Sequence, residues 1–170
     1  MKTYRAGSSA RKSSSQAAGR LAHAHAISPR TLTFVLLLAL CLQFLLGMLT
    51  NLYVQVPAAH PGSNAANYFV GVAQGVGWGL TQAALFLQLH VIVGLLLFLG
   101  SLWLLWRAIA LRDRAWIIIA TLGVLGIIGA GFNGASFMNY GHDFSSLIMS
   151  LAFLFSLVAY LVGLYLRAEQ

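Results

Sequence analysis

The stretch TLTFVLLLALCLQFLLGMLTNL, residues 31–52, decides the fold. It is apolar almost throughout, and a helix needs about 20 such residues to cross ~30 Å of hydrocarbon. Outward from it, residues 31–106 contain no Asp, Glu, Lys or Arg. Further apolar runs of spanning length lie at 82–108, 115–137 and 144–166. We therefore predict an all-α, polytopic integral membrane protein, built as a four-transmembrane-helix bundle.

The composition of the chain agrees with a lipid environment. The sequence is 59% hydrophobic and 8% charged, whereas roughly a quarter of residues carry charge in soluble domains. Its net charge of +7 belongs to the ends and one hairpin, so membrane lipid and not nucleic acid is the expected surrounding. Cys41 is the only cysteine, which leaves no disulfide framework, C-x-x-C pair or thiolate zinc site.

The segments between the apolar runs predict the topology. Residues 1–30 are basic, rich in Ser and Ala and without acidic residues, which favours a disordered cytoplasmic tail. An uncleaved first helix is favoured over a signal peptide, because the region before it is long and no small-x-small site follows. Residues 53–81 form the predicted extracytoplasmic loop, and 67–80 are apolar enough to lie in the interface or fold back over the bundle, so that the loop could serve as a lid. Residues 168–170 form the cytoplasmic end.

The basic residues set the predicted orientation. All ten fall on one side of the four spans: Lys2, Arg5, Arg11, Lys12, Arg20, Arg30, Arg107, Arg112, Arg114 and Arg167. Cytoplasmic loops carry the excess of Lys and Arg in membrane proteins. We therefore expect a multi-pass protein of the cell membrane with both termini in the cytoplasm.

His90 is the most informative position for function, because an ionisable side chain inside a spanning helix is costly and tends to face the bundle. It shares a small and polar stripe with Ala83, Gly94 and Ser101. On one interpretation His90 only packs, and it hydrogen-bonds across helices to Asn51 or Asn133. On the other, His90 is an axial ligand of haem b, since His-x-x-x-Gly leaves room for a flat macrocycle.

A haem of the bis-histidine kind needs a second ligand, and the sequence offers His142 or His60. Counted back from the arginines that end their helices, His90 and His142 differ in depth by about 12 Å. His60 lies in the predicted outer loop. His60, His142 and Asp143 also have the ligand types of a divalent metal site, but residues 139–143 are ordinary turn and capping residues, and we assign no metal.

Three features carry a resemblance to known membrane proteins. They are the helix number, the repeated Gly-x-x-x-Asn of Gly47-Met-Leu-Thr-Asn51 and Gly129-Ala-Gly-Phe-Asn133, and the segment His90-Val-Ile-Val-Gly94. In these features the chain resembles four-helix cytochrome b and haem A synthase-type half-bundles, and more broadly the small four-helix membrane proteins of bacteria. The resemblance implies a haem held by helix histidines. Only His90 matches, because Ser150 stands where its partner would be.

Polar residues near the outer ends of the spans predict an outer-half pocket lined by Asn51, Gln88, His90, Asn133, Asn139 and His142. No paired carboxylates or activated nucleophile accompany them, so no catalytic residue is assigned and an enzyme is disfavoured. We expect a non-enzymatic membrane protein whose pocket binds a small ligand, with haem b as the named cofactor candidate. A second alternative is an electron-transfer cytochrome or small enzyme.

The other alternative is a structural or accessory subunit of a larger membrane complex, or a homo-oligomer. Small residues recur on the third and fourth spans: Gly123, Gly126, Gly129, Gly131, Gly134, Ser145, Ala152, Ser156 and Gly163. Such residues let helix backbones approach closely. On this interpretation these faces pack against a partner, and His90 only forms a hydrogen bond between helices of the bundle.

Overall fold

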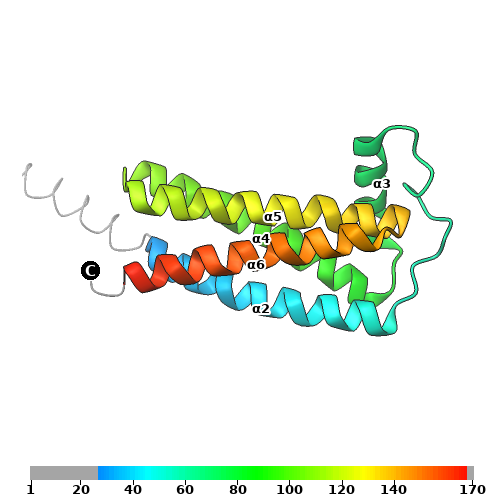
Figure 1. Ribbon diagram of the computed structural model, residues 1–170, viewed down its shortest axis with the longest axis horizontal. Helices are drawn as coiled ribbons and strands as arrows, with labels where there is room; N and C mark the ends of the chain where they lie inside the picture. The colour runs from blue at the N-terminus through cyan, green and yellow to red at the C-terminus, as the bar shows by residue number, and fades with distance from the viewer. Residues whose placement is uncertain (1–26, 168–170) are drawn as a thin grey trace, which may run out of the picture.

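The computed structural model describes residues 27–167, and this part of the chain contains helices and no strand. Four long helices lie side by side as a bundle: α2 (Pro29–Tyr53), α4 (Leu85–Ala110), α5 (Arg114–Tyr140) and α6 (Asp143–Leu166) (Figure 1). A shorter helix, α3 (Tyr68–Thr81), lies at one end. Residues 1–26 of the predicted tail and the predicted end 168–170 lie outside the described residues.

The four long helices have the length and composition to cross a membrane. They contain 24 to 27 residues, which at 1.5 Å per residue corresponds to about 36–40 Å. A bilayer core of ~30 Å requires less. The chain is therefore an all-α polytopic membrane protein, as its apolar runs predict.

Local capping decides where the helices begin and end, beyond the apolar runs themselves. Ser28 caps α2 by accepting from the Thr31 N–H at 3.1 Å, with Pro29 at the first helical position. Asp113 caps α5 by accepting from two first-turn amides at 3.1 and 3.3 Å. Gly141, at φ +66°, ends α5 in the left-handed conformation that glycine adopts without strain. The helix α5 therefore exceeds the predicted span 115–137 at both ends.

The predicted loop 53–81 contains a helix that the prediction omitted. α3 begins after Asn67, whose side chain accepts from two backbone amides at 3.0 and 3.2 Å. Its glycines at spacing four, Gly71, Gly75 and Gly79, are buried and lie on the side that packs on α4 and α5. In Figure 1, α3 runs crosswise to the long helices. Glycine weakens an isolated helix, but here it permits the close docking that stabilises this one.

The small residues of the last two helices pack against each other. A Cβ on Gly126 would lie 2.7 Å from the Ala152 carbonyl oxygen. Ser156 donates from its hydroxyl to the Gly123 carbonyl at 3.1 Å, and a Cβ on Gly163 would lie 2.7 Å from Ile119. The predicted close packing is therefore present between α5 and α6.

The charged side chains distinguish the two ends of the bundle. Among residues 27–167, all five arginines lie where α2 and α5 begin and α4 and α6 end, which we call the arginine end. Asp113 lies at this end and forms an ion pair with Arg167. The opposite end, which we call the cap end, carries α3 and only Asp143 among the described charged residues.

Candidate functional site

A glutamine and a histidine meet across α2 and α4 within the membrane-spanning segments. The Nε2 atoms of Gln43 and His90 are 3.2 Å apart, and we call these two residues the seam pair. A glycine faces each of them: a Cβ on Gly47 would lie 3.1 Å from the His90 ring, and one on Gly94 would lie 3.2 Å from the Gln43 amide. Each helix therefore makes room for the polar side chain of the other.

The seam pair leaves hydrogen-bonding capacity unused. The Nδ1 atom of His90 and the Oε1 atom of Gln43 are buried and have no hydrogen-bond partner among residues 27–167. The hydroxyl of Thr50, which follows Gly47 on the same side of α2, is also buried and without a partner there. Unpaired buried polar atoms cost about 1–3 kcal/mol each. A hydrogen-bond partner for these atoms would therefore stabilise the protein.

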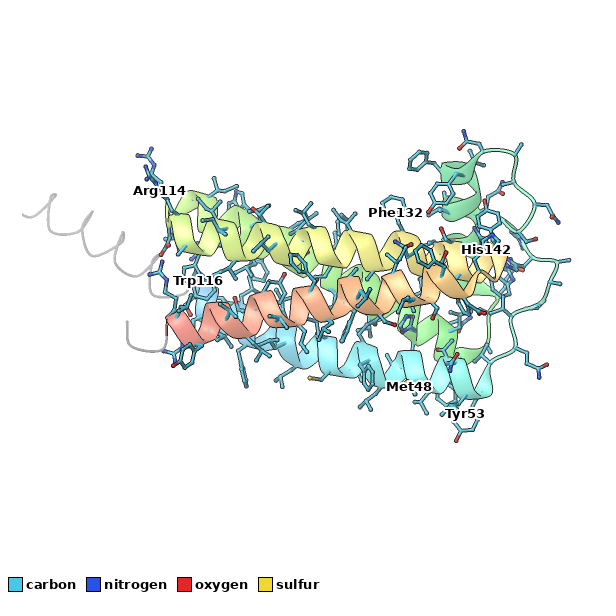
Figure 2. The ribbon with its side chains drawn as sticks, viewed as in Figure 1. Met48, Tyr53, Arg114, Trp116, Phe132 and His142 are labelled. Atoms are coloured by element: carbon cyan, nitrogen blue, oxygen red, sulfur yellow. The ribbon has the colours of Figure 1, made fainter. Side chains whose placement is uncertain are left out.

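The other two histidines among residues 27–167 lie at the cap end, each with neighbours of its own. The His60 ring stacks on Trp78 with a centroid distance of 4.6 Å. Its Nδ1 and Nε2 atoms face the carbonyl oxygens of Pro61 and Met138 at 3.0 and 3.2 Å. His142 is the exposed residue before α6 and stacks on Tyr140; Figure 2 shows it at the end opposite Arg114.

The remaining predicted pocket residues have different neighbours. Asn139 is buried beneath α3, where its side chain lies against Gly75 and has no hydrogen-bond partner in the described part of the chain. Asn133 donates to the carbonyl of Gly129 on its own helix at 2.9 Å. Asn51 is exposed and Gln88 is half-buried. The polar residues thus divide between the seam pair, the underside of α3 and the surface.

Two of the three predicted haem ligands, His60 and His90, have polar neighbours at their ring nitrogens. Both ring nitrogens of His60 face carbonyl oxygens, and the Nε2 of His90 faces Gln43. For His90 to bind a haem iron through Nε2, the Gln43 side chain would first have to turn away. Within residues 27–167, no three His, Cys, Asp or Glu side chains form a group that could hold a metal ion.

The partner of His90 is Gln43, which was not among the predicted site residues, and not Asn51 or Asn133. The signal was present: Gln43 is a polar amide inside the apolar run 31–52 and precedes Gly47 by one helical turn. A glutamine in such a position tends to hydrogen-bond across helices. Two intramembrane polar residues on neighbouring spans are therefore better considered together.

The fold and site together define a four-span, all-helical membrane protein with a polar pair between α2 and α4. No protein family, curated protein or solved structure matches the chain. The function is therefore argued from the geometry of the chain itself.

Proposed function

We propose that this chain is a non-enzymatic membrane protein that binds a small lipophilic ligand or cofactor through the seam pair Gln43 and His90. The observation that carries the proposal is the unused hydrogen-bonding capacity of His90 Nδ1 and Gln43 Oε1. Polar and ionisable residues inside spanning segments are expensive and usually functional. A ligand that satisfies both atoms would offset that cost.

The seam pair specifies the chemistry of this ligand. If the Gln43 amide donates to His90 Nε2, then Nδ1 carries a proton, and the unused groups are the Nδ1–H donor, the second amide N–H and the Oε1 acceptor. If the amide is turned over, Nε2–H donates to the glutamine oxygen, and the unused groups become an NH₂ donor and an Nδ1 acceptor. Either assignment favours a ligand group that both donates and accepts, such as a hydroxyl, a carboxylic acid or an amide.

The alternative of a structural subunit loses one of its supports in this geometry. Three of the small residues that would have received a partner, Gly123, Gly126 and Gly163, are covered by the packing of α5 on α6, whereas Gly131 is exposed. The outward surfaces that remain on α6 are largely aliphatic and aromatic, as lipid contact requires: Leu147, Leu151, Leu154, Phe155, Val158, Leu161 and Val162 are exposed. This observation favours the ligand-binding proposal over an accessory role.

The test is mass spectrometry of small molecules extracted from the purified protein, together with an absorption spectrum of the oxidised and reduced protein. We expect the wild type to carry a compound whose amount falls by about tenfold or more in Gln43→Leu and in His90→Leu, because losing one buried partner costs 1–3 kcal/mol. Gln88→Leu is the matched control, since it removes a half-buried polar residue on α4 outside the pair. A Soret band lost in His90→Leu would identify the compound as haem.

A purely structural pair gives a different result. Replacing both partners of a hydrogen bond by apolar residues is nearly neutral, whereas replacing one leaves the other unsatisfied. If the double variant Gln43→Leu/His90→Leu unfolds like the wild type, and no extracted compound distinguishes the two proteins, the ligand-binding proposal is wrong and the seam pair serves only packing.

We further propose that the arginine end faces the cytoplasm of a cell membrane, which is supported by its five arginines among residues 27–167 and by the five Lys and Arg residues that precede them in the sequence. In a Cys41→Ser background, we expect a membrane-impermeant maleimide added outside intact cells to label Ser63→Cys. Arg112→Cys, in the exposed α4–α5 turn, should react only after the cells are opened. The opposite labelling pattern would reverse the orientation.

A further inference from the structure

A surface cavity of about 360 Å³, open to the outside of the bundle, lies at the arginine end between α2 and α6, separate from the seam pair. It is lined by Arg30, Thr31 and Phe34 of α2 and by Leu164 of α6. Arg30 and Phe34 are one helical turn apart, so the aromatic ring is attached about 6 Å further along the helix than the guanidinium. The cavity therefore combines a cationic, hydroxyl-bearing rim with an apolar wall that continues into the membrane-spanning part of the bundle.

The charges around the cavity favour a negatively charged ligand. Within residues 27–167 the arginine end carries five arginines and one carboxylate, Asp113, which is paired with Arg167. Arg107 donates to the Ile27 carbonyl at 3.3 Å and so holds the start of α2 close to α4. The net positive charge of this end favours an anionic group at the membrane surface.

We propose that this cavity binds one phospholipid with an anionic headgroup. The lipid phosphate lies at Arg30 and Thr31, and an acyl chain lies along Phe34 and Leu164. A soluble phosphate would use the rim and leave the apolar wall exposed. A zwitterionic lipid would cover that wall but would gain less from the net positive charge. The combination of both surfaces in one cavity is the property of an anionic phospholipid site.

The experiment is native mass spectrometry of the full-length protein, released from detergent micelles containing equal amounts of phosphatidylglycerol and phosphatidylcholine. We expect the wild type to retain one phosphatidylglycerol in preference to phosphatidylcholine. Arg30→Gln should weaken phosphatidylglycerol retention by about fivefold, the effect of one cation near an anionic lipid surface. Arg114→Gln removes the same charge from the same end of the bundle without lining the cavity, so it should change retention less than twofold.

A second pair of variants leaves every charge in place. Leu164→Trp should fill the cavity and reduce phosphatidylglycerol retention as strongly as Arg30→Gln, since tryptophan is well tolerated at membrane interfaces. Leu161→Trp, on the exposed side of α6, should have no effect. Equal losses in Arg30→Gln and Arg114→Gln, an unchanged Leu164→Trp, or displacement of the lipid by soluble glycerol phosphate would overturn the proposal.

Discussion

Gly126→Leu is expected to destabilise the bundle more than any other single substitution proposed for this chain. The new Cβ would lie 2.7 Å from the Ala152 carbonyl oxygen and 3.1 Å from the Ser156 amide nitrogen. Both are backbone atoms and cannot rotate away, so α5 and α6 must separate. Overpacking costs about 1–3 kcal/mol and occasionally more, and separation also breaks the bond from Ser156 to Gly123. We expect a loss of about 3 kcal/mol in the free energy of unfolding, measured by circular dichroism during denaturation in detergent.

Gly131→Leu provides the matched control on the same helix. Gly131 is exposed, and a Cβ there would meet no atom within 4 Å. Leucine has a better helix propensity than glycine by about 1 kcal/mol, so this variant should be neutral or slightly stabilised. Equal destabilisation of the two variants would show that the contact between α5 and α6 is not what limits stability.

Gly75→Val is expected to release α3 while leaving the four long helices folded. The new Cβ would lie against the Asn139 carboxamide and 2.8 Å from the Met138 Cε. The loop before α3 packs closely on Gly75 as well, because a Cβ on Gly62 would lie 2.8 Å from the Gly75 nitrogen. A docking loss of about 2 kcal/mol raises the open population of α3 by roughly thirtyfold. Hydrogen exchange of residues 68–81 should accelerate by that factor.

Gly77→Val distinguishes docking from helix propensity. Gly77 lies two residues further along α3 and is exposed, and a Cβ on it would meet no atom within 4 Å. Like Gly75→Val, this variant places a valine on α3, but hydrogen exchange of residues 68–81 should proceed at the wild-type rate. If Gly75→Val lowers the protection of all helices equally, α3 unfolds only with the whole bundle and is not a separately docked element.

The docked helix α3 contacts the helix that carries part of the candidate site. A Cβ on Gly79 would lie 3.2 Å from the Val91 side chain, and Val91 follows His90 directly on α4. The last turn of α3 therefore contacts the helix that carries half of the seam pair. If the proposed ligand reaches the pair from the cap end, Gly75→Val should lower the amount of compound that the purified protein retains, which the extraction experiment measures.

Part of the candidate site was predictable from the sequence. His90 lies against a neighbouring helix, as the cost of an intramembrane imidazole requires. Its partner was not predictable from the spacing of residues, because the rotation and vertical alignment of α2 against α4 select Gln43. The neighbours of two other predicted pocket residues also depend on the tertiary structure: Asn133 donates to its own helix backbone, and the Asn139 side chain lies against Gly75 of α3.

The sequence by itself determined the four spanning helices, because uncharged apolar runs of this length place their backbone in lipid only as helices. It also determined which ends carry the arginines. Only the tertiary structure decided that Gln43 meets His90, that the glycines of α5 meet Ser156, and that residues 68–81 form a docked helix. The hydrophobicity of a segment follows from the order of its residues. Packing and hydrogen bonding depend instead on which faces of two helices are brought together.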